Sequence, residues 1–325
     1  LQPMHVSIDL RPVRVQARAR RRALLWLALA LVLGLAMGCG DDGLRRAPLV
    51  RLNALSPLPD TDPQIAPLQV AVSAIISQQG TVASYQPLLD YLGRRLDRPM
   101  QLVQRRTYAE VNDLIRRNEV DMAFICTRAY VQGRRAFGME LLAIPVVNGQ
   151  TVYYSMVIVR ADHPAQRFED LRGAIFAFTD PLSTTGYLYP SVLLKRMGES
   201  AASFFQRTFF TYSHDHAIYA VAEGVADAAA VDSLVLDYAI QVDPALRDRL
   251  RVLGKSPAFG IPPVVVGPGI RPQTKALLSE ALFAMADDME GRQALQALGV
   301  DRFLPGRDQD YDSVRALERE LDRQP

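Results

Sequence analysis

Three consecutive hydroxyl side chains followed by a glycine, Ser183-Thr184-Thr185-Gly186, form the stretch with the clearest capacity for chemistry. They follow the apolar run 174–178, which predicts a buried strand, and they precede a predicted helix. A strand-to-helix turn leaves backbone N–H groups unpaired at the positive end of the helix dipole. Combined with uncharged hydroxyl donors and a glycine that permits close backbone approach, these groups could bind an anion. The alternative is an ordinary hydroxyl N-cap, because one such hydroxyl suffices.

His214 and Asp232 are further side chains that could act together with this turn. Ser183, His214 and Asp232 have the residue types of a hydrolytic triad, which raises an enzyme as one hypothesis. The serine lacks the G-x-S-x-G pattern of a nucleophile elbow, however, and its hydroxyl neighbours favour anion binding over catalysis. His214 and His216 could instead hold a metal, but the chain has 4 histidines and no evident third ligand. We therefore predict neither a metal nor a cofactor.

Strand and helix patterns alternate before the turn, and this alternation predicts the fold class. The runs 68–72, 100–103 and 121–126 predict strands, and helices are expected at 81–96, with Thr81 as N-cap, and at 108–117. An alternation of this kind implies an α/β fold with a largely parallel sheet covered on both faces.

A weak internal repeat relates 121–126 to the later run 227–232. When the two runs are aligned, Cys126 falls on Asp232 and Thr127 falls on Ser233. Both pairs follow the C-terminal end of a predicted strand, where ligands bind in open α/β sheets. Cys126 and Thr127 are therefore added to the candidate ligand-binding residues.

The chain is long enough for two lobes, and two segments are candidates for the connections between them. The β-rich run 153–160 and the run 250–253 are predicted to cross from one lobe to the other. The terminal helices, at 273–298 and 312–321, are expected to pack on lobe one. The predicted divisions are 68–160 plus 255–325 for lobe one and 161–254 for lobe two.

The first 39 residues predict that the chain is exported. Four arginines between Arg18 and Arg22 precede an apolar run that is too short to span a bilayer. The run ends at Cys39 and resembles a bacterial lipoprotein signal, so we expect Cys39 to be lipidated in the cell envelope. Residues 40–67, rich in proline and aspartate, are expected to form a flexible tether. The net charge of +2 argues against nucleic acid and against a polybasic membrane surface.

Several separated motifs, in the right order over residues 68–298, resemble the phosphate/phosphite/phosphonate-binding receptors of ABC importers. The motifs are the turn with its flanks at 178–190, His214-Asp215-His216-Ala217, Asp227 to Ser233, Tyr108 with 120–124, and Ser256-Pro257 with 262–266. The resemblance implies a type II periplasmic-binding-protein fold, in which two α/β lobes are joined by a two-strand hinge and enclose the ligand. It also implies an extracytoplasmic, monomeric receptor that is not an enzyme.

Members of that family hold a tetrahedral phosphorus oxyanion, and their motif positions carry over to individual residues here. The positions implied by the resemblance are Ser183, Thr184, Thr185, Tyr108, His214 and Asp232. Tyr153 or Tyr154 could also reach the cleft, and the sequence does not decide between them. An acceptor such as Asp232 suits a ligand that carries a P–OH proton and disfavours sulfate, which carries none. The alternative for Asp232 is a helix cap.

Cys126 leaves two functional hypotheses open. After lipidation of Cys39 it has no cysteine partner, and the favoured interpretation is a small buried hydrophobic residue. The alternative is a soft ligand, because a related branch of the family senses arsenite for a signalling kinase. The leading hypothesis is thus a lipid-anchored receptor that delivers an oxyanion to an ABC permease. The alternative is an arsenite-type sensor that docks a membrane histidine kinase.

Overall fold

The computed structural model describes residues 66–323. The predicted signal peptide, its Cys39 and all but the end of the predicted tether lie outside these residues. None of the helices formed by residues 66–323 is both long enough and apolar enough to cross a lipid bilayer.

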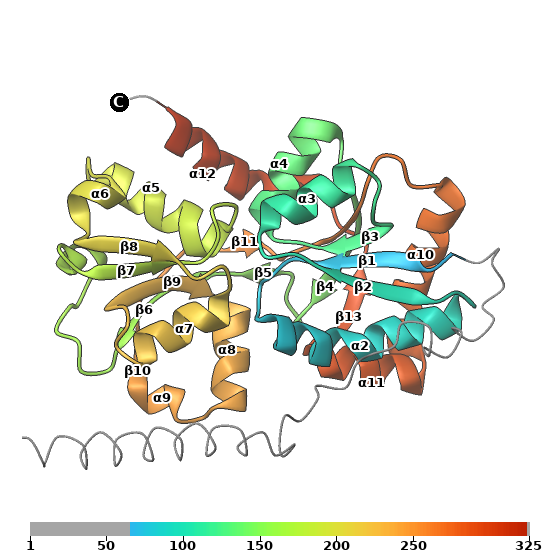
Figure 1. Cartoon of the computed structure of the whole chain (residues 1–325), viewed down its shortest axis with the longest axis horizontal. Coiled ribbons are helices and arrows are strands. Elements are labelled where there is room, and N and C mark those ends of the chain that lie inside the picture. Colours follow the sequence, from blue (N-terminus) through green and yellow to red (C-terminus); the bar gives the residue numbers. More distant parts are fainter. Residues whose placement is uncertain (1–65, 324–325) are drawn as a thin grey trace, which may run out of the picture. The chain divides into compact units, whose positions relative to one another are not determined.

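The first sheet has the strand order β13-β4-β12-β3-β1-β2 and forms lobe one (Figure 1). Strand β1 pairs in parallel with β2 and β3, whereas β12 runs antiparallel to β3 and β4. The strands are β1 (Leu68–Val72), β2 (Met100–Gln104), β3 (Met122–Phe124), β4 (Glu140–Val146), β12 (Val264–Val266) and β13 (Arg302–Leu304).

Helices cover both faces of this sheet because side chains alternate along its strands. Val70 and Val72 pack on one face with the first helix and three later helical segments, whereas Ala71 packs on the other face with the second and third helices. The first group is α2 (Gln78–Arg95), α10 (Pro272–Ala284), η4 (Met285–Asp287) and α11 (Met289–Leu298), and the second is α3 (Tyr108–Arg116) and α4 (Thr127–Phe137). The predicted α/β class is confirmed.

The second sheet has the order β10-β6-β9-β7-β8 and forms lobe two. Ala177 and Ala229 face a core shared with α7, α8 and α9, whereas Phe176 and Phe178 face a core shared with η2, α5 and α6. The strands are β6 (Ser155–Arg160), β7 (Ile175–Phe178), β8 (Arg207–Phe210), β9 (Ala228–Asp232) and β10 (Leu250–Lys255). The helices are η2 (Phe168–Leu171), η3 (Thr184–Leu188), α5 (Tyr189–Arg196), α6 (Ala201–Phe204), α7 (His214–Ala222), α8 (Ser233–Val242) and α9 (Leu246–Arg249).

The chain passes between the two sheets beside a small two-stranded ribbon. Strand β5 (Val152–Tyr153) pairs with β11 (Phe259–Gly260), and both lie between the lobes in Figure 1. The two segments predicted to cross, 153–160 and 250–253, instead contribute β6 and β10 to the second sheet, where β6 pairs with both β9 and β10. The predicted boundary at residue 160 therefore falls too late, because β-rich composition does not reveal which sheet a strand joins.

Two local expectations also differ from the structure. Helix α2 begins at Gln78 rather than after Thr81, whose hydroxyl donates to the carbonyl of Ser77 inside the first turn at 3.0 Å. This back-bonding lets a threonine lie within a helix. The last helix, α12 (Asp312–Asp322), follows η5 (Asp308–Tyr311) and contacts both lobes rather than lobe one alone. Its Glu318 pairs with Arg128 of α4, and its Glu320 pairs with Arg196 of α5.

Candidate functional site

The turn after β7 forms a π-helical segment, η3, which continues directly into α5. Ser183 is its N-cap, and the Ser183 hydroxyl accepts from the backbone N–H of Gly186 at 2.9 Å. A Cβ atom at position 186 would lie 1.9 Å from Oγ1 of Thr179. Packing against Thr179 therefore requires a glycine at position 186.

His214 faces this turn as a neutral donor. Its Nδ1 accepts from the backbone N–H of Asp232 at 3.0 Å, which leaves the ring proton on Nε2. Nε2 lies 3.4 Å from the Ser183 hydroxyl. Burial lowers the pKa of His214 to about 3, so the imidazole is uncharged at neutral pH. The Ser183 oxygen already accepts from Gly186, and its own proton remains available for a ligand.

Four hydroxyls near the turn, those of Tyr108, Thr179, Thr185 and Ser213, are buried and make no hydrogen bond with any group of residues 66–323. Two of them lie at predicted ligand positions, namely Tyr108, the first residue of α3, and Thr185, and both of these residues are 0% exposed. Burial raises the pKa of the Tyr108 phenol well above its usual value, so this phenol is a neutral donor. A buried polar group without a partner costs about 1–3 kcal/mol, which makes such atoms markers of a ligand site. We call Tyr108, Ser183, Thr185 and His214 the donor cluster.

Cys126 and Asp232 occupy equivalent places, as the internal repeat predicted. Each is the N-cap of the helix that follows its strand, with φ and ψ of −70° and 151° for Cys126 and −71° and 130° for Asp232. The carboxylate of Asp232 accepts from the backbone N–H of Leu234 at 2.8 Å, so the helix-cap interpretation is correct for one of its oxygens. Burial raises the pKa of Asp232 to about 7. The carboxyl can therefore carry a proton close to neutral pH.

The thiol of Cys126 is buried against the turn. Its Sγ lies 3.9 Å from the Thr184 hydroxyl and 4.0 Å from the Tyr153 hydroxyl. Burial raises the thiol pKa, which makes the sulfur a poor nucleophile. Between the two candidate tyrosines, the structure brings Tyr153 to this group, whereas the Tyr154 ring lies under the ammonium of Lys255.

Thr127, the other residue of the repeat, uses its hydroxyl within lobe one. It donates to the carbonyl of Gly260 at 3.0 Å and so ties the start of α4 to β11. Its proton is committed to that carbonyl, which makes Thr127 a support for the site rather than an additional free donor.

Side chains of lobe two cap the N-termini of three helices of lobe one. Asp180 accepts from the Tyr108 backbone N–H at 3.1 Å, and Thr184 accepts from the Arg128 backbone N–H at 2.9 Å. Asp215 accepts from the Ser77 backbone N–H through both carboxylate oxygens, at 2.9 and 3.1 Å. We call Asp180, Thr184 and Asp215 the cross-lobe caps. They connect the lobes at the N-terminal, anion-favouring ends of α2, α3 and α4.

Sequence reasoning gave no role to Asp180 and Asp215. Their N–H partners lie far away along the chain and become neighbours only when the lobes meet, so no local pattern marks them. Thr184 was predicted as a ligand donor, and in the structure its oxygen is also engaged between the lobes.

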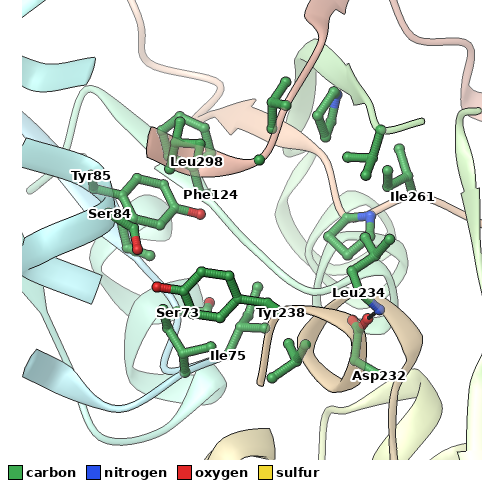
Figure 2. Close-up of a pocket in the computed structure, with 18 of the residues that line it drawn as sticks. Ser73, Ile75, Ser84, Tyr85, Phe124, Asp232, Leu234, Tyr238, Ile261 and Leu298 are labelled. Atoms are coloured by element: carbon green, nitrogen blue, oxygen red, sulfur yellow. Dashed lines mark hydrogen bonds between the residues drawn. The ribbon is translucent and has the colours of Figure 1, made fainter. Parts of the chain in front are cut away.

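A pocket of about 320 Å³ lies beside this group and between the lobes. In Figure 2, Asp232 and Leu234 of lobe two lie on one side of the pocket, and Tyr85 and Leu298 of lobe one lie on the other. Most of the lining is apolar. We call it the interlobe pocket, and its lining includes Ser73, Ile75, Ser84, Tyr85, Phe124, Ile125, Asp232, Leu234, Val235, Asp237, Tyr238, Ile261, Pro262, Pro263, Leu298, Val300 and Phe303.

Three comparisons place the chain among known proteins. A family model described as ABC transporter, phosphonate, periplasmic substrate-binding protein matches residues 70–311. The phosphonates-binding periplasmic protein of Escherichia coli is 26% identical over 255 residues, which cover 77% of this chain and 75% of that protein. The phosphate-import protein PhnD of Mycolicibacterium smegmatis is 27% identical over 271 residues, which cover 77% of this chain and 84% of that protein.

A solved structure shows the same architecture. PhnD1 of Prochlorococcus marinus, in complex with methylphosphonate, matches with a TM-score of 0.71 and 18% identity, covering 78% of this chain and 98% of that one. This match confirms the type II periplasmic-binding-protein fold that the motifs implied.

Proposed function

The chain belongs to the phosphonate family of periplasmic substrate-binding proteins of ABC transporters, and on that premise we propose that it is a lipid-anchored receptor for a phosphorus oxyanion. As a member of this family it is an extracytoplasmic binding protein rather than an enzyme, and its partners are a small ligand and an ABC permease. The finer proposal is that phosphonate, phosphite or phosphate binds at the donor cluster and is delivered from there to the permease.

The fully buried hydroxyls of Tyr108 and Thr185, which have no hydrogen-bond partner among residues 66–323, carry this proposal. With Nε2–H of His214 and the free proton of Ser183, they supply several neutral donors from both lobes. Neutral donors can hold an anion without burying a cation, and hydrogen bonds to a charged acceptor are the stronger kind. The guanidinium of Arg128 is bonded instead to Glu318 and to the carbonyl of Pro181.

Asp232 supports an oxyanion that can carry a proton. Its raised pKa lets the carboxyl and the ligand share one proton, either as a neutral acid that donates or as a carboxylate that accepts from P–OH. Sulfate carries no such proton at neutral pH and would face a carboxylate without a bridging hydrogen. We therefore propose that Asp232 disfavours sulfate, and that this selectivity grows above pH 7.

The relatives support the same class of ligand. The two curated relatives are described as binding phosphonates and as importing phosphate, and the Prochlorococcus structure holds methylphosphonate. The arsenite-sensor alternative requires an accessible, reactive Cys126. The burial of this thiol and its raised pKa do not favour that role.

The test of the site is calorimetric titration of the Thr185→Val variant with methylphosphonate and phosphate. Valine keeps the branched shape and removes one donor, so binding of both ligands should weaken by about 1–3 kcal/mol. Thr208→Val, at an exposed position on β8, is the matched control and should bind as the native chain does. If the Thr185→Val variant and the native chain bind these ligands with equal affinity, the turn is not part of the binding site.

Lipidation of Cys39 is proposed from the sequence alone and has its own test. The full chain expressed in a bacterium should yield a mature N-terminus at Cys39 with the mass of an attached lipid. Cys39→Ala should leave the precursor uncleaved at that position. A native mature chain with an unmodified Cys39 would exclude the anchor and leave the binding proposal untouched.

A further inference from the structure

The interlobe pocket extends the site beyond the space that a small inorganic oxyanion requires. We propose that it holds an apolar alkyl or aryl substituent of an organophosphonate whose phosphorus group is bound by the donor cluster. The inference rests on the proposed function and adds a substrate class to it. At about 320 Å³, the pocket lies at the lower end of the size range of small-molecule sites.

The pocket and the donor cluster are neighbours through Asp232. This residue lines the pocket, and its backbone N–H is bonded to Nδ1 of His214, whose Nε2 faces the turn. Ile125, the residue before Cys126, also lines the pocket. The four donor-cluster residues themselves do not line the pocket, so we infer that the substituent of a ligand anchored there reaches the pocket past Asp232.

The lining favours an apolar group over a charged one. Phe124, Ile261 and Leu298, all labelled in Figure 2, are typical of the surface that surrounds the pocket. Of the two carboxylates in the lining, Asp232 has one oxygen engaged as the cap of α8 and is proposed to share a proton with the phosphorus group, and Asp237 is exposed to solvent. An ammonium group would therefore lose most of its hydration against apolar walls, whereas an alkyl or aryl group would gain from the same burial.

The Ser73 hydroxyl in the lining indicates that the pocket is a ligand site and not a gap left by imperfect packing. The hydroxyl of Ser73 is fully buried, makes no hydrogen bond with the residues that the structure describes and belongs to the pocket wall. It follows the C-terminal end of β1, the edge of an open α/β sheet where ligands bind. Ser73 could donate to an ether or hydroxyl oxygen on an otherwise apolar substituent.

Both lobes build the pocket, so its contents affect closure. Tyr85 comes from α2 of lobe one, and Leu234 and Tyr238 come from α8 of lobe two. The cross-lobe cap from Asp215 to the backbone of Ser77 lies just before α2 and connects the lobe-one wall of the pocket to lobe two. A substituent in contact with both walls should favour the closed arrangement of the lobes.

The experiment compares phosphonates that share the head group and differ in the substituent. Calorimetry of the native chain uses methylphosphonate, n-butylphosphonate, phenylphosphonate and 2-aminoethylphosphonate. The butyl and phenyl compounds should bind roughly tenfold or more tightly than methylphosphonate, because a few additional buried carbons are sufficient for that ratio. 2-Aminoethylphosphonate should not bind more tightly than n-butylphosphonate.

Two variants that fill the interlobe pocket, one from each lobe, test whether the substituent binds there. Leu234→Trp on α8 and Leu298→Trp on α11 should each lower the ratio of butyl to methyl affinity to about one. The matched controls are Val242→Trp on α8 and Leu277→Trp on α10, where the native side chains are 64% and 54% exposed. The controls should keep the native ratio.

The outcomes separate this inference from the proposed function. If methylphosphonate or phosphate binds but the butyl and phenyl compounds bind no better, or if 2-aminoethylphosphonate binds best, the apolar substituent is wrong and the receptor proposal stands. A butyl-to-methyl ratio that survives both filling variants would also overturn the inference. If no phosphorus oxyanion binds at all, both the proposed function and this inference are wrong.

Discussion

The donor cluster and the interlobe pocket lie side by side and are built in opposite ways. The donor cluster is polar, fully buried and held by hydrogen bonds such as those from Gly186 to Ser183 and from Asp232 to His214. The interlobe pocket is mostly apolar and takes its walls from both lobes. On the proposals made above, the donor cluster would recognise the oxyanion by the directions of its hydrogen bonds, whereas the interlobe pocket would select the attached group by its size and polarity. Asp232 is shared between them, because it lines the interlobe pocket and its backbone N–H donates to His214 of the donor cluster.

The largest effect is expected at this shared residue and concerns stability in the absence of ligand. Burial raises the pKa of Asp232 from 3.8 to about 7, so the folded chain holds a proton that the unfolded chain releases between these values. The stability that this group contributes is therefore present below pH 4 and is lost as the pH rises towards 7, by up to about 4 kcal/mol. Asp232→Asn keeps a cap oxygen and removes the titration.

Chemical denaturation of both proteins between pH 4 and 8 measures this prediction. The stability of the asparagine variant relative to the native chain should increase up to about pH 7 and then level off. His214, whose pKa is lowered, destabilises both proteins as the pH falls below 6.5, and this contribution cancels in the difference. A difference that stays constant across the range would mean that Asp232 ionises normally.

The next largest effect is expected when the contact between the lobes is weakened, because both regions should then lose ligand affinity together. Asp180→Ala combined with Asp215→Ala deletes two cross-lobe caps, each worth about 0.5–2 kcal/mol. Methylphosphonate and butylphosphonate should lose affinity by similar factors, and small-angle scattering should show a more open chain. Asp248→Ala, at an exposed position on α9, is the control. Loss of affinity for only one ligand would show that these carboxylates act within one region.

How much the sequence revealed differs between the same two regions. Ser183, Thr184 and Thr185 are consecutive and follow a clear strand pattern, so the turn could be predicted, and the repeat correctly paired Cys126 with Asp232. The pocket walls come from segments as distant as Ser73, Tyr238 and Leu298. Their proximity results from sheet order and lobe contact, which no local spacing encodes. For the same reason, β6 and β10 were assigned to crossings rather than to the second sheet.

A smaller effect is expected in the donor cluster, at the hydroxyl of Tyr108. Tyr108→Phe removes a buried hydroxyl that has no hydrogen-bond partner in the described part of the chain. The ligand-free variant should be as stable as the native chain or more stable, whereas binding of every phosphonate should weaken by about 1–2 kcal/mol. Denaturation and calorimetry on one preparation measure both quantities. A variant that is less stable and binds normally would identify Tyr108 as a core residue alone.

The smallest effect is expected at Cys126. Because burial raises its thiol pKa, a thiol reagent should modify it slowly in the native chain, with or without phosphonate. Cys126→Ala should change methylphosphonate affinity by less than about 1 kcal/mol, because a thiol is a weak hydrogen-bond donor. Rapid labelling that phosphonate suppresses would instead favour the arsenite-sensor alternative.

The most direct measurement is a crystal structure of this chain grown with methylphosphonate. We expect phosphonate oxygens within hydrogen-bond distance of the Tyr108 and Thr185 hydroxyls and of Nε2 of His214, with the methyl group directed towards the interlobe pocket. A phosphonate bound elsewhere, with the two hydroxyls still unpaired, would contradict the claim that the donor cluster is the oxyanion site.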